Sequence, residues 1–354
     1  RSIFCLKTRN HSQSELCQTI YKLIYFPLFI LDMLYQVEDS KLRCLACNHK
    51  CLIAEGKRGI CGVRENQGGK LVLLVHSKVA AKHVDPIEKK PLFHFLPGTQ
   101  AYSIGTVGCN LHCGFCQNWQ MSQERKILGE ELTPEQAKKE AAPYMSIAYT
   151  YNEPTIFIEY AKDIAEITAD KRHIFITNGY FSEEALLEMN FVDALNIDLK
   201  SFSDEFYQKN CGAKLIPILE SIKRCVDQGK WVEITTLLIP GENDSEEELK
   251  RIARFIALVD KEIPWHISAF HPDYKMTNKP NTSFVSLLKA HEIGREAGLA
   301  YIYLGNISDD NYSSTFCPKC QKMLIRRNGY NVKMEGLKNG KCMYCHYPIK
   351  GVWS

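Results

Sequence analysis

The stretch Gly108-Cys109-Asn110-Leu111-His112-Cys113-Gly114-Phe115-Cys116-Gln117-Asn118 carries three cysteines with the spacing C-x-x-x-C-x-x-C. The β-branched run at residues 102–107 comes directly before it and predicts a strand, so the cysteines are expected on the following loop. No fourth cysteine stands close by in the sequence. Three thiolates on a cubane iron–sulfur cluster leave one iron without a protein ligand, and an open position is typical of reactive metal sites.

The alternative for this loop is a zinc site completed by His112, because zinc needs four ligands and no cofactor. The placement after a strand favours the cluster, since active sites of parallel α/β folds lie at the carboxyl ends of the strands. Gly108 and Gly114 are expected to let the backbone turn tightly around the group.

From residue 102 onward, short β-branched runs alternate with helical stretches, which predicts parallel strands joined by crossover helices. Helix starts are expected at Thr133, Ser182 and Ser245, and the last of these helices should end near Val259. About six βα units and a closing strand fall short of a complete eight-unit barrel, so a partial, open TIM-like barrel is predicted. The expected strands cover residues 102–107, 146–151, 173–177, 192–199, 231–239, 265–270 and 300–304.

The 354 residues include 15 cysteines, 45% hydrophobic and 24% charged residues, with a formal net charge of +3. These values exclude a disordered or multi-span membrane chain and provide no basic field for nucleic acid. Most of the cysteines form compact groups, which in a long chain indicates metal or iron–sulfur ligands in a reducing cytoplasm rather than disulfides. The apolar run at residues 23–31 is too short to cross a bilayer and is expected to pack as a helix. We therefore expect a cytoplasmic protein.

Two further groups of four cysteines flank the predicted barrel. At the carboxyl end, two C-x-x-C pairs joined by a segment with an Asn328-Gly329 turn predict a zinc ribbon with structural zinc, and a second iron–sulfur cluster is the alternative. The spacing of the amino-terminal group fits neither a ferredoxin nor a zinc ribbon, so zinc and an auxiliary cluster both stay open there, with His49 as a spare ligand. These groups are Cys317, Cys320, Cys342 and Cys345, and Cys44, Cys47, Cys51 and Cys61.

Four parts follow along the chain: a segment of unclear role at 1–40, a cysteine-rich domain at 41–98, the barrel at 99–308 and the zinc-ribbon-like module at 309–354. Cys211 and Cys225 lie in and before an apolar-periodic helix and are expected to be core residues.

The cluster loop, with the aromatic Phe115 before its third thiol, resembles the signature of the radical S-adenosylmethionine (radical SAM) superfamily. More narrowly, the chain resembles the radical SAM component of the AmmeMemoRadiSam system, which is related to the pyruvate formate-lyase activating enzymes. The resemblance runs from about residue 41 to the end. Its further motifs lie at residues 85–94, 149–155, 177–179, 196–200, 240–244 and 269–274.

The resemblance implies an oxidoreductase in which a 4Fe–4S cluster on Cys109, Cys113 and Cys116 binds SAM and cleaves it reductively to a 5'-deoxyadenosyl radical, which abstracts a hydrogen atom. It also implies a flavodoxin or ferredoxin as electron donor. The substrate would be a glycyl-radical protein, or a small molecule handled together with the other two AmmeMemoRadiSam components. A non-catalytic zinc-binding scaffold is the competing hypothesis, but a scaffold has no use for an open iron.

The resemblance further implies a SAM site at the strand ends. Phe115 would lie against the adenine, and Asn152 and Glu153, which follow the second strand, would hold the methionine amine. Tyr151 and Asn152 stand where the wider family has two glycines. The other SAM-binding candidates are Thr177, Asn178, Asp198, Lys200 and His271.

Overall fold

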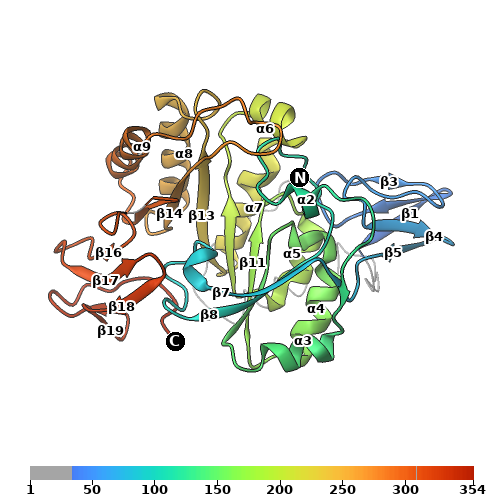
Figure 1. Ribbon diagram of the computed structural model, residues 1–354, viewed down its shortest axis with the longest axis horizontal. Coiled ribbons are helices and arrows are strands. Elements are labelled where there is room, and N and C mark those ends of the chain that lie inside the picture. The colour runs from blue at the N-terminus through green and yellow to red at the C-terminus, as the bar shows by residue number, and fades with distance from the viewer. Residues whose placement is uncertain (1–33, 308) are drawn as a thin grey trace, which may run out of the picture. The chain divides into compact units, whose positions relative to one another are not determined.

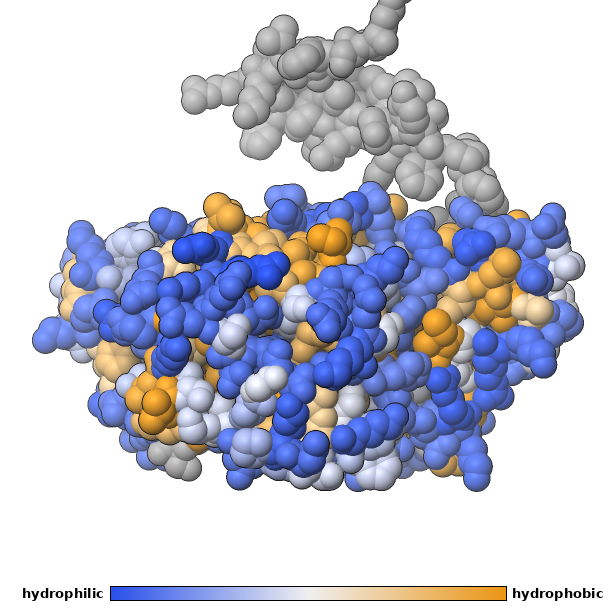
Figure 2. All heavy atoms as spheres, turned by 90° about the horizontal axis from the view of Figure 1, so that it is seen from above, coloured by the Kyte–Doolittle hydropathy of each residue, from blue (hydrophilic) through white to orange (hydrophobic). Residues whose placement is uncertain are grey.

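The structure is a computed structural model that describes residues 34–307 and 309–354, and Tyr35–Ser354 form one compact unit within it (Figure 1). The apolar run at residues 23–31 lies outside the described residues. Within the described part, no helix is long and apolar enough to cross a membrane. Figure 2 shows a surface that is mainly hydrophilic and is interrupted by a few hydrophobic patches.

The core of this unit is an eight-stranded sheet with the order β15-β14-β13-β12-β11-β10-β8-β7. Seven of its strands are parallel, which confirms the predicted partial barrel of six βα units and a closing strand. The predicted strand bounds differ from the observed ones by at most two residues. The parallel strands are β8 (Gln100–Gly105), β10 (Ser146–Tyr149), β11 (Arg172–Thr177), β12 (Ala194–Asp198), β13 (Trp231–Leu238), β14 (Trp265–Ala269) and β15 (Ile302–Gly305).

The eighth strand, β7 (Ala81–Pro86), runs antiparallel to β8 along its whole length and was not predicted. Its middle residues, His83 and Val84, are exposed, so the segment lacks the hydrophobic alternation by which a strand is recognised. Polar, exposed residues are common on edge strands, where they discourage pairing with other chains. The segment before the barrel therefore contributes one edge of the barrel sheet.

The helices that cover the sheet begin where the sequence predicts. Thr133 forms a capping box with Gln136 at α3 (Pro134–Ala141), and Ser182 caps α5 (Glu183–Glu188). Ser245 caps α8 (Glu246–Val259), which ends at the predicted residue. The remaining helices of the described part are α2 (Trp119–Ser122), α4 (Ile158–Ile167), α6 (Asp204–Cys211), α7 (Leu215–Asp227), α9 (Phe284–Glu296) and the short 3-10 turns η1 (Ile87–Lys89), η2 (Pro154–Phe157) and η3 (Met189–Phe191).

The segment at residues 87–96, which we call the plug, fills the amino end of the barrel. Its apolar side chains, among them Phe95 and Leu96, pack against alanines and Ile174 at the starts of the strands. The buried Glu233 carboxylate accepts hydrogen bonds from the backbone amides of Phe93 (2.9 Å) and His94 (2.8 Å). The plug therefore fixes this end of the sheet, and the carboxyl ends of the strands remain for the chemistry.

Short strands form the two flanking cysteine-rich parts. Before the barrel these are β1 (Tyr35–Glu38), β2 (Lys41–Cys44), β3 (Leu52–Ile53), β4 (Arg64–Gln67), β5 (Lys70–Leu73) and β6 (Lys78–Val79), the last pairing with β9 (Glu130–Glu131). After it come β16 (Thr315–Phe316), β17 (Met323–Asn328), β18 (Asn331–Met334), β19 (Leu337–Lys338) and β20 (Lys341–Cys342). The β17–β18 hairpin confirms the predicted turn with a shift: Asn328 pairs with Asn331, so Gly329 and Tyr330 make the turn, with Gly329 at φ +56°.

Candidate active site

The loop that carries Cys109, Cys113 and Cys116 follows β8 at the carboxyl edge of the sheet, as predicted. Gly108 has φ +85°, and a Cβ atom there would lie 2.5 Å from the carbonyl oxygen of Cys61, so this position requires glycine. Gly114 has no left-handed backbone angle, and the expectation that it is needed for a tight turn is not supported.

The cluster loop is held by backbone hydrogen bonds from two other parts of the barrel. The amide of His112 donates to the carbonyl of Cys211 (2.9 Å), and the amide of Gly114 donates to the carbonyl of Asn210 (2.9 Å). The carbonyl of Gly114 in turn accepts from the amide of Lys275, 3.0 Å away. The end of α6 and the loop after β14 therefore fix the positions of the thiols.

A fourth cysteine that is distant in the sequence lies near the cluster loop in the fold. Cys211, the last residue of α6, is fully buried, and its thiol lies beside Cys113. The proximity of the Cys211 thiol is the main cause that lowers the pKa of Cys113. The prediction that Cys211 and Cys225 are buried is confirmed, but only Cys211 contacts the cluster loop.

Asp198 and Lys200 lie at the end of β12 and face the same loop. Lys200 Nζ donates to Asp198 Oδ2 at 2.6 Å and lies 5.8 Å from the centre of the Phe115 ring. Burial favours the neutral amine of Lys200, but Asp198 and the nearby thiols outweigh it and raise its pKa. A fixed ammonium therefore stands beside Cys113 and Phe115, where it can offset the negative charge of thiolates.

Glu153 is buried, and its carboxylate accepts four hydrogen bonds from the protein. The donors are the amide and hydroxyl of Thr155, the hydroxyl of Thr177 at 2.8 Å and the amide of Asn178 at 2.8 Å. Burial nevertheless raises the pKa of Glu153 above its usual value. The group therefore joins the loops after β10 and β11, beside Cys109.

Tyr151 and Asn152, which stand where the family resemblance expects two glycines, follow the end of β10. Tyr151 adopts φ +70°, a left-handed conformation that glycine takes more easily. The Asn152 amide donates to the hydroxyl of Thr106 (3.0 Å) and to the carbonyl of Gly108 (2.8 Å), immediately before Cys109. Asn152 therefore shapes the start of the cluster loop.

The remaining candidate residues, Asn178, Phe115 and His271, differ in how deeply they are buried. Asn178 donates to the side-chain oxygen of Asn110 (2.8 Å) and lies 4.0 Å from Cys109 Sγ. Phe115 is buried against Phe206, with ring centres 5.9 Å apart. His271 lies beyond the end of β14 and is exposed. The structure thus brings Asn152, Glu153, Thr177, Asn178, Asp198 and Lys200 to the cluster loop.

The four carboxyl-terminal cysteines form a compact tetrad. Their sulfur atoms all lie within 4.8 Å of one another, and the Cys317–Cys345 and Cys320–Cys342 pairs are each 3.6 Å apart. Tetrahedral zinc with bonds of about 2.3 Å separates its sulfur ligands by about 3.8 Å. The tetrad can therefore hold one zinc-sized ion, as the ribbon prediction requires.

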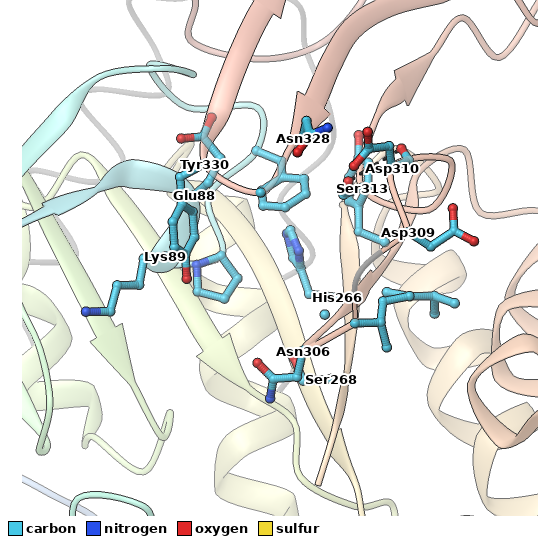
Figure 3. A pocket seen from close by; sticks show the side chains of 17 residues that line it. Glu88, Lys89, His266, Ser268, Asn306, Asp309, Asp310, Ser313, Asn328 and Tyr330 are labelled. Carbon is cyan, nitrogen blue, oxygen red and sulfur yellow. Dashed lines mark hydrogen bonds between the residues drawn. The ribbon is translucent and has the colours of Figure 1, made fainter. Parts of the chain in front are cut away.

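A polar cavity of 780 Å³, not predicted from the sequence, lies between the open edge of the barrel and the ribbon (Figure 3). Residues of the plug, of β14 and β15, and of the β17–β18 turn line it. No single motif indicates it, because its walls come from segments far apart in the chain.

Comparisons with known proteins agree with this geometry. The pattern of the family described as Radical SAM superfamily matches residues 103–256. An uncharacterised protein of Methanocaldococcus jannaschii is 42% identical over 327 residues, covering 90% of this chain and 98% of that protein. The pyruvate formate-lyase-activating enzyme of Staphylococcus epidermidis is 23% identical over 195 residues, 49% of this chain and 76% of that enzyme.

Among solved structures, a domain of the pyruvate formate-lyase-activating enzyme from Bacteroides vulgatus matches 46% of this chain and 99% of its own, with a TM-score of 0.39 and 23% identity. A radical SAM methyltransferase from Sphaerobacter thermophilus matches 59% of this chain and 67% of its own, with a TM-score of 0.46 and 17% identity.

The partial parallel barrel with a three-cysteine loop after its first parallel strand defines an α/β enzyme of the iron–sulfur class. The chain belongs to the radical SAM superfamily. Membership implies an enzyme that uses a 4Fe–4S cluster and SAM. The narrower resemblance to the AmmeMemoRadiSam component stays a prediction.

Proposed function

We propose that the protein is a radical SAM enzyme that cleaves SAM at a 4Fe–4S cluster held by Cys109, Cys113 and Cys116 and abstracts a hydrogen atom from its substrate. The observation that carries the proposal is that three free thiols on one loop face the Asp198–Lys200 pair at the carboxyl edge of a parallel barrel. When bound, the reduced cluster supplies the electron that splits the sulfonium into methionine and a 5'-deoxyadenosyl radical.

The residues around the loop fit such a group. Cys109 Sγ accepts from the amide of Leu111 (3.4 Å) and Cys116 Sγ lies 3.1 Å from the hydroxyl of Ser122, contacts that stabilise negative charge on sulfur. In the proposal, Lys200 and Asp198 offer opposite charges to the carboxylate and amine of SAM, and Glu153 and Asn178 keep the loops in place. Phe115 would contact the adenine.

Anaerobic reconstitution followed by an assay of 5'-deoxyadenosine with dithionite and SAM tests this proposal. The wild type should form 5'-deoxyadenosine, and Cys116→Ala should form none, because its cluster lacks a third ligand. Cys225→Ala is the control, since Cys225 is also a free thiol but is fully buried away from the loop. An iron-loaded wild type that makes no 5'-deoxyadenosine would refute the radical mechanism and favour a metal scaffold.

For the substrate, the resemblance to activating enzymes suggests a glycyl-radical protein, while the polar cavity favours a small molecule as second candidate. Glu88 lines this cavity, is 5% exposed, and its Oε2 has no hydrogen-bond partner within the described residues. A ligand with a hydrogen-bond donor would satisfy this oxygen.

Extract fractions distinguish these substrates. If the cavity receives a small molecule, the low-mass fraction of an extract should increase 5'-deoxyadenosine formation, and Ser268→Trp, which fills the cavity, should abolish the increase. Stimulation by the protein fraction alone would favour a glycyl-radical protein instead. The proposed electron donor is a flavodoxin or ferredoxin, and the other two AmmeMemoRadiSam components are proposed as further partners.

A further inference from the structure

The four amino-terminal thiols converge in space although their spacing along the chain fits neither a ferredoxin nor a zinc ribbon. Cys44 ends β2, Cys47 and Cys51 lie on the turn to β3, and Cys61 precedes β4. The amide of Cys44 donates to the carbonyl of Cys51 (2.9 Å), and the Cys51 sulfur accepts from the amide of Ile60 (3.5 Å). Burial raises the pKa of the Cys47 thiol, and the charges of Cys44, Cys61 and Cys51 raise it further because these thiols lie nearby. The four side chains therefore form one cluster of free thiols.

This cluster is more open than the tetrad of the zinc-ribbon-like module. Across residues 34–307 and 309–354, the carboxyl-terminal tetrad is the one set of three or more such ligand atoms lying within 4.8 Å of one another. Neither among the amino-terminal thiols nor among Cys109, Cys113 and Cys116 do three sulfur atoms lie within 4.8 Å of one another. A single zinc draws its sulfurs together, whereas a cubane spreads its thiolates over several iron atoms. The spacing therefore favours an iron–sulfur cluster.

The amino-terminal thiols also sit directly against the catalytic loop. The carbonyl of Cys61 is so close to Gly108 that a Cβ atom there would lie 2.5 Å from it. The His49 ring bonds to the carbonyl of Asn110 (2.8 Å), and the amide of Asn48 donates to the carbonyl of Tyr180 (3.0 Å). A metal centre bound by these thiols would therefore lie next to the backbone of Gly108, the residue before Cys109.

The buried, positively charged side chain of Arg64 lies close to the amino-terminal thiols. Arg64 is 1% exposed, and its charge acts on Cys44 and Cys61. Its guanidinium also pairs with Glu159 and donates to the carbonyl of Ile156 (3.0 Å), close to the SAM-site residue Glu153. An anionic thiolate cluster needs such compensation away from solvent.

We propose that Cys44, Cys47, Cys51 and Cys61 bind a second iron–sulfur cluster, which passes electrons to the cluster on the catalytic loop. One electron from a low-potential protein donor reduces one ferric iron of the second cluster to ferrous. The same electron then reduces the catalytic cluster and returns the second cluster to its oxidised state, so no proton or further reactant is needed. The electron-transfer role rests on the proposed function, whereas the metal site does not.

Metal counts test the site. Anaerobically reconstituted wild type should hold about eight iron, eight sulfide and one zinc per chain. The triple variant Cys109→Ala, Cys113→Ala, Cys116→Ala should keep about four iron and four sulfide, and should show an electron paramagnetic resonance signal after dithionite. About four iron and two zinc in the wild type would overturn the proposal. The wild-type count decides even if the triple variant fails to fold, and it does not depend on SAM cleavage.

Freeze-quench reduction tests the electron transfer. In the triple variant only the proposed amino-terminal cluster is left. A reduced flavodoxin should reduce it at about the rate at which the wild type accepts its first electron from the same donor. In the double variant Cys47→Ala, Cys51→Ala, reduction of the catalytic cluster should slow by about tenfold or more. Reduction of that cluster at the wild-type rate would overturn the relay. The zinc content of both variants is the control, because zinc that stays bound to the ribbon indicates that the fold is intact.

Discussion

Cys211 is the residue outside the cluster loop that has the largest effect on the pKa of Cys113. It stands on a different element from the catalytic loop, and its thiol and backbone carbonyl contact that loop at Cys113 and His112 respectively. A hydrogen bond to a cluster sulfur stabilises the more negative, reduced state and raises the reduction potential. Cys211 therefore acts as a positioning residue for the catalytic cluster.

Cys211→Ala should lower the reduction potential of the catalytic cluster, because a thiol that can donate a hydrogen bond to Cys113 is lost. A redox titration followed by electron paramagnetic resonance measures this shift. Cys225→Ala, an equally buried cysteine on α7, should leave the potential at the wild-type value. Equal potentials for the two variants would show that the Cys211 contact is only structural.

At the scale of elements, the plug ties the amino end of the barrel to the ribbon through His94. Its ring Nδ1 donates to the carbonyl of Lys350 (2.9 Å), and its Nε2 lies 2.6 Å from the hydroxyl of Tyr303, which donates to it when the imidazole is neutral. Burial lowers the pKa of His94 to about 4. The plug is thus held by a histidine that must stay unprotonated.

The stability of the protein should therefore fall as the pH drops from about 6.5 to about 4. In this range His94 binds a proton in the unfolded chain but stays neutral in the folded protein. This difference lowers the free energy of unfolding by up to about 3 kcal/mol. Unfolding free energies measured by denaturant across this range should depend less steeply on pH for His94→Gln than for the wild type. The exposed His83→Gln variant should keep the wild-type slope, and a parallel slope for His94→Gln would contradict the assignment.

At the scale of the whole unit, the ribbon supports the open edge of the barrel. Arg327 is fully buried and donates to the carbonyl of Phe93 (2.6 Å) and to the hydroxyl of Thr315 (2.8 Å). Val352 exchanges backbone hydrogen bonds with the plug at His94 and Leu96, each 2.7 Å long. The ribbon that carries the cysteine tetrad therefore supports the plug and one wall of the cavity.

Loss of the ribbon metal should loosen the plug. Cys320→Ala, or removal of zinc by a chelator, should increase hydrogen exchange at the amides of Leu96 and Val352, because the hydrogen bonds between the plug and the segment at Val352 lose their anchor. The amides of β10 and β11, in the middle of the sheet, should keep their protection. Unchanged exchange at the plug would show that the ribbon folds and acts independently of the barrel.

The sequence by itself determined the parallel barrel, the starts of its main helices and the three-cysteine loop. These depend on local signals: the alternation of β-branched and helical runs, the caps at Thr133, Ser182 and Ser245, and the spacing of cysteines on one loop. It also indicated that Asp198 and Lys200 share a face, because two residues two apart at the end of a strand point to the same side.

Only the tertiary structure decided what lies beside these residues. The approach of Cys211 to Cys113, the packing of the amino-terminal thiols against Gly108 and the cavity beneath the ribbon all join segments distant in the chain. The polar edge strand β7 was missed for a similar reason, since its pairing with β8 rather than its own side chains makes it a strand. Local patterns specify elements, whereas long-range contacts depend on how the folded elements pack, which spacing along the chain does not encode.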